Sequence, residues 1–190
     1  YGIAFLLLIA IFLNDEPKVK TNYTKLYSES MFLDNNVKVK STKNDYVDNQ
    51  SLKGKITLVF FGYTSCPDFC PDTLARASRI FKKLNNNDGM QLLFISIDPK
   101  DELDVIKKYV EYFNEDFIGV SGEQSEILKL GYQLGIEKLE PMQNHMSQRV
   151  ISHTNHLVLV DDNANIMGIF KGPFDSRAMS LVTKSLLQTN

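Results

Sequence analysis

The pattern of apolar and polar positions predicts alternating strands and helices from residue 56 onward. Nearly continuous apolar runs, rich in β-branched and aromatic side chains, are typical of strands buried on both faces, and they occur at residues 56–61, 91–97 and 117–120. Apolar side chains at steps of three and four predict amphipathic helices after each of these strands, at residues 74–84, 103–113 and 125–134. Asp101 stands where it could cap the second of these helices.

The C-terminal part of the chain is predicted to add a β-hairpin and a closing helix. The extended runs 156–160 and 166–170 flank a turn of three polar residues at 161–163. Residues 175–187 have a helical pattern, whereas residues 137–148 have no period and are predicted to form a loop. The whole order predicts an α/β domain with helices on both faces of a mixed sheet.

The N-terminal residues have a different character. Residues 1–13 are apolar and uncharged, and because a membrane helix needs about 20 apolar residues, we interpret them as a truncated membrane anchor. A cleaved signal peptide and a buried first element of the fold are the alternatives. Residues 14–30 are polar and are predicted to be a linker, and the domain is predicted to span residues 31–190, opening with a β-hairpin of residues 31–33 and 37–40.

Composition and charge narrow the possible functions. The chain has 190 residues, of which 43% are hydrophobic, enough for one ordinary core. Its 21 basic and 23 acidic residues give a net charge of -2 without a long run of either sign, so a nucleic-acid partner is not expected. Two cysteines are too few for a disulfide-stapled small domain or for a four-thiolate zinc site.

The two cysteines, Cys66 and Cys70, lie between a predicted buried strand and the start of a helix. A helix N-terminus stabilises a thiolate, which is the nucleophilic and metal-binding form of cysteine. A disulfide closing so short a loop would contribute only roughly 2 kcal/mol of stability, so a purely structural bond is disfavoured. The flanking residues Pro67, Asp68 and Asp72 argue against a pair of buried, inert thiols.

The spacing of the cysteines leaves metal binding and redox chemistry open. Residues four apart on a helical turn have β-carbons about 5–6 Å apart, whereas a disulfide prefers roughly 3.5–4.5 Å, and this favours a metal. Thiolates select Cu(I) and Zn(II), and a structural zinc site needs four protein ligands, while copper accepts three. A loop can still close the disulfide, so a redox function is not excluded.

Three histidines could complete a copper site. His153 and His156 have opposite parity on an extended strand, so at most one of them is expected to face the cysteines. His156 lies inside an apolar run, and His153 lies before it. Met142, His145 and Met146 in the predicted loop could help to transfer copper, although an ordinary loop explains them as well.

Several segments resemble the SCO/SenC family of copper-binding, thioredoxin-like proteins of cytochrome oxidase assembly. The segments are Val59–Pro71, Phe94–Pro99, Phe117–Gly122 and Ser152–Thr154, within a match from about residue 53 to residue 187. The resemblance implies a thioredoxin-like fold and copper bound by Cys66, Cys70 and His153. The chain departs from the family where it has Ser65 in place of a frequent histidine and Ser152 in place of a frequent aspartate.

The resemblance also implies a function. The protein is expected to be a copper chaperone, not an enzyme, that delivers copper to the binuclear site of cytochrome c oxidase subunit II. Its domain is expected outside the cytoplasm, at the periplasmic face of a bacterial inner membrane or at the mitochondrial inner membrane. The main alternative is a thiol–disulfide oxidoreductase that keeps the oxidase cysteines reduced through a redox disulfide of Cys66 and Cys70. A peroxidase-like enzyme and a copper-linked redox sensor are further alternatives.

Overall fold

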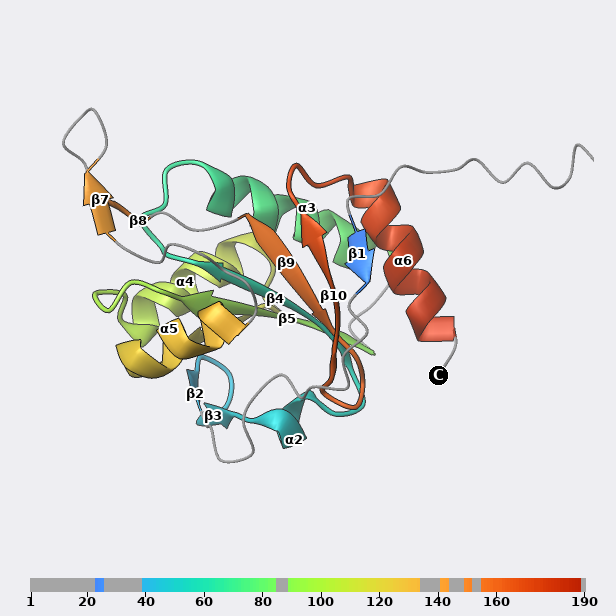
Figure 1. Ribbon diagram of the computed structural model, residues 1–190, viewed down its shortest axis with the longest axis horizontal. Helices are drawn as coiled ribbons and strands as arrows, with labels where there is room; N and C mark the ends of the chain where they lie inside the picture. The colour runs from blue at the N-terminus through green and yellow to red at the C-terminus, as the bar shows by residue number, and fades with distance from the viewer. Residues whose placement is uncertain are drawn as a thin grey trace, which may run out of the picture.

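A computed structural model of the chain describes residues 23–25, 39–84, 89–133, 141–143, 149–151 and 155–188. The strands of the central mixed sheet lie in the order β1-β10-β9-β4-β5-β6-β2-β3, and β7 and β8 form a separate pair (Figure 1). The strands are β1 (Tyr23–Lys25), β2 (Val39–Ser41), β3 (Tyr46–Val47), β4 (Ile56–Gly62), β5 (Met90–Ser96), β6 (Ile118–Ser121), β7 (Pro141–Gln143), β8 (Arg149–Ile151), β9 (His156–Val160) and β10 (Ile166–Lys171). The helices are α2 (Asn49–Leu52), α3 (Phe69–Lys83), α4 (Leu103–Phe113), α5 (Gln124–Gln133) and α6 (Ser176–Gln188).

The centre of the sheet consists of strands that the sequence predicts to be buried. All seven residues of β4 and all seven of β5 are buried, as is typical of strands at the centre of a sheet whose faces are both covered. β5 pairs in parallel with β4 and β6, while β9 runs antiparallel on the other side of β4. In this register Phe60 of β4 lies between Phe94 of β5 and Leu157 of β9. The prediction of an α/β domain with a mixed sheet is therefore confirmed.

Helix α3 connects β4 to β5 and contacts both α4 and α6. The Ser78 hydroxyl donates a hydrogen bond to the carbonyl of Phe113 at the end of α4, at 2.8 Å. The Arg76 guanidinium donates to the carbonyl of Phe174, shortly before α6, at 3.0 Å. The helix begins at Phe69, five positions before the predicted start, so its first turn includes Cys70.

Several short elements, among them β1 and β7, lie in segments where the sequence predicts none. β1 falls in the predicted linker and pairs with β10, where the ring of Tyr23 lies 4.8 Å from that of Phe170. β7 falls in the predicted loop 137–148 and pairs with β8. Strands of three residues are too short to show a period of two, so β1 and β7 are recognised only by their pairing in the structure.

The predicted N-terminal anchor, residues 1–13, lies outside the described residues. In the part of the chain that the structure describes, no helix is long and apolar enough to cross a membrane. Of the predicted N-terminal hairpin, the structure describes only residues 39 and 40, which belong to β2. β2 pairs with β3 and with β6, so it extends the main sheet.

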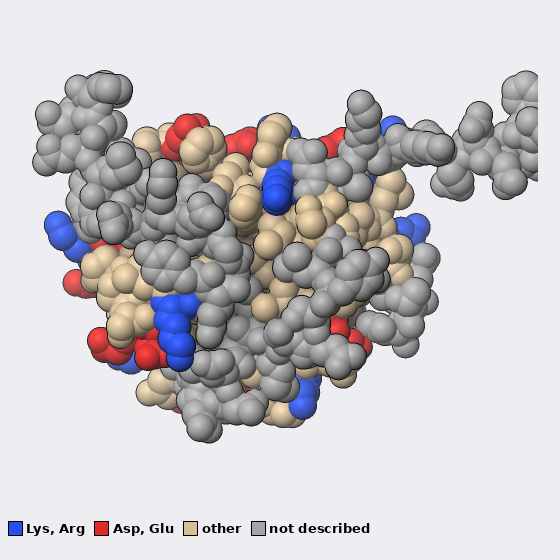
Figure 2. All heavy atoms as spheres, viewed as in Figure 1, with Lys and Arg blue, Asp and Glu red and all other residues tan. Residues whose placement is uncertain are grey.

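The surface carries charges of both signs. Figure 2 shows basic and acidic side chains scattered around one face, without a continuous patch of either sign among the coloured residues. An exposed ion pair links Lys43 to Asp116 at 3.5 Å, and another links Arg76 to Asp72 at 2.7 Å. Among the described residues, this distribution agrees with the net charge of -2.

Candidate metal centre

The cysteine pair lies where the chain passes from β4 to α3. β4 ends at Gly62, and the backbone amide of Cys66 donates to the carbonyl of Tyr63 at 3.2 Å in the turn that follows. Cys70 is the second residue of α3, which has Asp68 as its N-cap. Neither cysteine forms a disulfide, and their side chains are hydrogen-bonded to each other. The fold therefore brings the two predicted thiols into contact.

Both thiols are buried. Cys70 is 0% exposed and Cys66 is 8% exposed. A β-carbon on Gly62 would lie 2.9 Å from the Cys70 Sγ and 2.7 Å from Cε2 of Phe94, so the sulfur packs against β4 beside an aromatic ring. The sequence argument that polar neighbours keep the pair from burial is wrong, because Pro67, Asp68 and Asp72 are exposed while the sulfurs point inward.

Burial raises the pKa of the Cys70 thiol above its ordinary value, and the neighbouring Cys66 thiol and the charge of Asp101 raise it further. The backbone amide of Tyr63 lowers the pKa but does not compensate for the burial. The expectation that the helix N-terminus holds a thiolate is therefore not met in the dithiol form. Because a metal binds the thiolate, metal binding at Cys70 must release a proton.

The raised pKa predicts that the reduced protein loses stability between pH 8.5 and pH 9.5. An unfolded cysteine ionises near pH 8.5, whereas the buried Cys70 keeps its proton, so a rising pH favours the unfolded state. The loss from one such group is at most about 1.4 kcal/mol per pH unit. Urea unfolding at several pH values measures it, and Cys70→Ala should show a shallower decline. Equal declines in both proteins would contradict the prediction.

Asp101 has a different role from the predicted helix cap. The N-cap of α4 is Glu102, which makes no side-chain capping bond, and the Asp101 side chain is bonded to the cysteine loop. Its carboxylate accepts hydrogen bonds from the backbone amide of Thr64 at 2.8 Å, the Thr64 hydroxyl at 2.6 Å and the Ser96 hydroxyl at 2.6 Å. Capping and loop binding need the same residue type, so the sequence could not distinguish them.

Tyr109 is a neighbour of the pair that the sequence analysis missed. Its ring centre lies 5.5 Å from that of Phe94, the residue beside the Cys70 sulfur. Burial raises the pKa of Tyr109 above its ordinary value. Within the described ranges its hydroxyl is buried without a hydrogen-bond partner. In the sequence Tyr109 is one apolar position of an amphipathic helix, and nothing marks it out.

The predicted third ligand, His153, lies outside the described residues together with Ser152 and Thr154. His145 and Met146 lie outside them too, and Met142 belongs to β7. His156 opens β9 opposite Lys171 of β10, and burial followed by the charge of Lys171 lowers its pKa. In the described residues no group of three or more histidine, cysteine or acidic side chains could hold a metal ion. The described part of the centre is thus the cysteine pair alone.

The entry to β9 is bound to the helix that carries Cys70. The Thr73 hydroxyl, about one turn beyond Cys70 on α3, donates to Oδ1 of Asn155 at 3.1 Å. The Asn155 carbonyl accepts from the backbone amide of Gly172 at 2.9 Å. Because β9 is antiparallel to β4, this entry lies at the edge of the sheet where β4 ends. Residue 155 is therefore fixed beside the first turns of α3.

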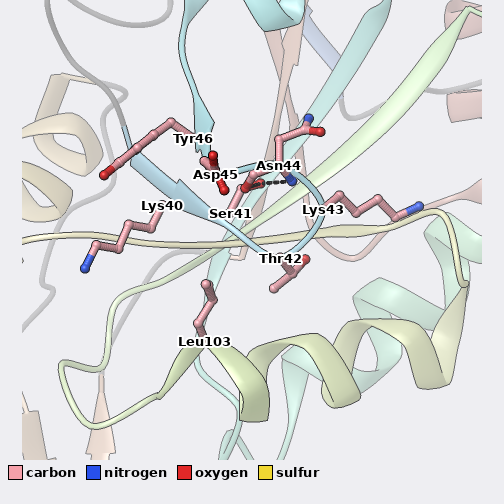
Figure 3. A pocket seen from close by; sticks show the side chains of 8 residues that line it. All are labelled: Lys40, Ser41, Thr42, Lys43, Asn44, Asp45, Tyr46 and Leu103. Carbon is pink, nitrogen blue, oxygen red and sulfur yellow. Dashed lines mark hydrogen bonds between the residues drawn. The ribbon is translucent and has the colours of Figure 1, made fainter.

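A separate surface hollow of about 840 Å³ lies at the β2–β3 hairpin (Figure 3). Its lining comes from residues 40–46 and from Leu103 at the start of α4. Figure 3 shows the two lysine side chains extending in different directions, while the Ser41 hydroxyl bonds to the backbone of Asn44. The lining holds no thiol or imidazole, so this hollow is not the candidate metal centre.

Comparison with known proteins finds the same fold together with copper. A putative copper-binding protein of Stutzerimonas stutzeri is 30% identical over 141 residues, which cover 73% of this chain and 69% of that protein. The copper-bound structure of Bradyrhizobium japonicum ScoI has a TM-score of 0.69 at 28% identity and covers 78% of this chain and 96% of that one. BsSco, described as a cytochrome c oxidase assembly protein with a disulfide switch, has a TM-score of 0.61 at 21% identity, covering 81% of this chain and 92% of that one.

These similarities confirm the predicted thioredoxin-like fold, and they confirm copper as the metal of these proteins. A family model described as SCO1/SenC matches residues 29–188, which include Cys66, Cys70 and His153. Because this match spans most of the chain, the protein belongs to the SCO1/SenC family.

Proposed function

We propose that the protein is a membrane-anchored copper chaperone that binds Cu(I) through Cys66, Cys70 and His153. Its domain lies outside the cytoplasm, and it delivers copper to the binuclear site of cytochrome c oxidase subunit II. Copper is then the cargo of the protein. The observation that carries the proposal is the contact between two buried thiols after the end of β4.

The chemistry of the pair suits Cu(I). Thiolates are soft ligands that select Cu(I), and two of them leave a site that a single imidazole completes for a three-coordinate metal. A structural zinc ion would need a fourth protein ligand. The burial of both sulfurs would keep a bound ion away from water.

The assignment of His153 as third ligand is supported by the position of its neighbour. Asn155 is bonded to Thr73 on the helix of Cys70, and β9 starts at the sheet edge where β4 ends. Two residues of extended chain span at most about 7 Å, so a ligand at position 153 would be within that reach of Asn155. His156 is less suited, because it is paired with the opposite strand beside the positive charge of Lys171.

A copper titration tests the ligand set. We expect the reduced protein to bind one Cu(I) per chain, and His153→Ala to bind it at least about tenfold more weakly, since even outer partners of metal ligands contribute 10- to 100-fold. Competition with a chromophoric Cu(I) chelator under anaerobic conditions measures both the stoichiometry and the affinity.

The matched control is His156→Ala, which removes a histidine three positions away and should keep the wild-type affinity. One copper per chain at undiminished affinity in His153→Ala would remove His153 from the site. The same loss in both histidine variants would point to damage of the β9 entry instead of a lost ligand.

The thiol–disulfide oxidoreductase remains the second candidate, because the contact between the Cys66 and Cys70 side chains suits a reversible disulfide. Mixing the protein with the copper-free domain of subunit II separates the two functions, with the acceptor cysteines reduced for the transfer of copper and oxidised for the redox assay. A chaperone transfers copper only when loaded, and His153→Ala impairs the transfer. An oxidoreductase reduces the acceptor disulfide without copper, and His153→Ala does so at the wild-type rate.

A further inference from the structure

The carboxylate of Asp101 joins the cysteine loop to the end of the neighbouring strand. Oδ2 accepts from the backbone amide of Thr64 at 2.8 Å and from the hydroxyl of Ser96, the last residue of β5, at 2.6 Å. Oδ1 accepts from the Thr64 hydroxyl at 2.6 Å. The carboxylate is itself held in a turn, because the Asp101 backbone amide donates to the Asp98 carbonyl at 3.0 Å.

These bonds act on the segment that carries Cys66. Thr64 is two residues before Cys66, and the backbone amide of Cys66 is bonded to the Tyr63 carbonyl at 3.2 Å. On the β4 side, the Gly62 carbonyl accepts from the backbone amide of Ile97 at 2.8 Å. The loop is therefore fixed twice to the β5–α4 connection before it reaches the first sulfur.

We propose that Asp101 is a positioning residue for the cysteine pair, which holds the Cys66 loop so that the Cys66 sulfur meets that of Cys70. The inference rests on the proposed function in that it concerns the same two sulfurs. Asp101 acts through Thr64 and need not touch copper. Nothing in the pattern of apolar and polar residues distinguishes this role from a helix cap.

The physical reason is that a fixed loop raises the effective concentration of the Cys66 thiol at the Cys70 thiol. Two groups held in a productive geometry react far more readily than the same groups on a mobile loop. The step that reports this is exchange with glutathione disulfide. Two protein thiols become one disulfide bond between Cys66 and Cys70, and the oxidant takes up both electrons and both protons to give two molecules of glutathione. A looser loop lowers the equilibrium constant of this exchange.

Four variants separate an effect of loop positioning from an effect of the Asp101 charge. In Asp101→Asn the amide can keep all three hydrogen bonds, with the Thr64 hydroxyl accepting where it now donates, and only the charge is lost. Thr64→Val removes the hydroxyl bond and keeps the charge of Asp101. Asp101→Ala removes both. Asp104→Ala, an exposed acid in the first turn of α4, is the control for net charge.

The experiment measures the equilibrium constant of the copper-free protein with a glutathione redox buffer at pH 7. We expect it to fall about tenfold in Asp101→Ala, which corresponds to about 30 mV, and about threefold in Thr64→Val. Asp101→Asn and Asp104→Ala should stay within about twofold of the wild type. Urea unfolding of the same samples verifies that the variants are folded, and Thr64→Val decides the question if Asp101→Ala does not fold.

Two results would overturn the inference. One is a wild-type constant in Asp101→Ala. The other is a constant in Asp101→Asn as low as that of Asp101→Ala while Thr64→Val is unchanged, since Asp101 would then act by charge. No copper is present in this measurement, so its failure is distinguishable from failure of the copper titration and leaves the proposed function standing.

Discussion

Cys70→Ala is expected to abolish tight Cu(I) binding while the protein stays folded. The substitution removes one of two thiolates, and even groups that only support metal ligands contribute 10- to 100-fold in affinity, so we expect a loss of more than about 100-fold. Cys70 is fully buried and its sulfur lies against Gly62 and Phe94, so no other donor can take its place without rearrangement of the core.

Competition with a Cu(I) chelator measures this loss, and circular dichroism verifies the fold. Ser65→Ala is the matched control, because it removes a polar atom from the exposed residue beside Cys66 and should bind copper as the wild type does. Cu(I) binding by Cys70→Ala within tenfold of the wild type would show that copper is held elsewhere, and the proposed function would then be wrong.

Gly62→Ala is expected to damage both the fold and the copper site. The new β-carbon would lie 2.7 Å from Cε2 of Phe94 and 2.9 Å from the Cys70 Sγ, both fully buried, so one of these neighbours must move. Overpacking of a dense core costs about 1–3 kcal/mol in the free energy of unfolding. Because one of the displaced atoms is the sulfur itself, Cu(I) affinity should fall as well.

Urea unfolding and the chelator competition measure the two effects. Gly122→Ala is the matched control, since its β-carbon would meet the Ile127 side chain at an ordinary 3.4 Å and the backbone there is not left-handed. It should change neither quantity. Wild-type stability together with wild-type affinity in Gly62→Ala would contradict the close packing of the Cys70 sulfur against β4.

The parts of the fold that could be predicted are those with a strong local pattern. The runs that form β4 and β5 are apolar at nearly every position because both faces are covered, and this pattern is visible without any knowledge of pairing. β1 could not be predicted, since its stability depends on β10 and on the packing of Tyr23 against Phe170, which lies far away along the chain.

The candidate site was predictable in its residue types but not in its environment. The position of Cys66 and Cys70 between a strand and a helix start was correct, but the Cys70 sulfur packs against Gly62 and Phe94, which come from two strands. The bonds from Thr64 and Ser96 to Asp101 likewise join separate segments. Copper coordination by His153 stays a prediction, since that residue lies outside the described residues.

The antiparallel pairing of β9 with β4 links packing in the hydrophobic core to the proposed metal site. Leu157 is held opposite Phe60, and only three residues separate it from His153. A slip of β9 by one residue would turn its buried side chains outward, so apolar packing strongly specifies the register. The same packing therefore fixes the position at which β9 starts. Selectivity for a metal would in this way depend on leucines and valines that never touch it.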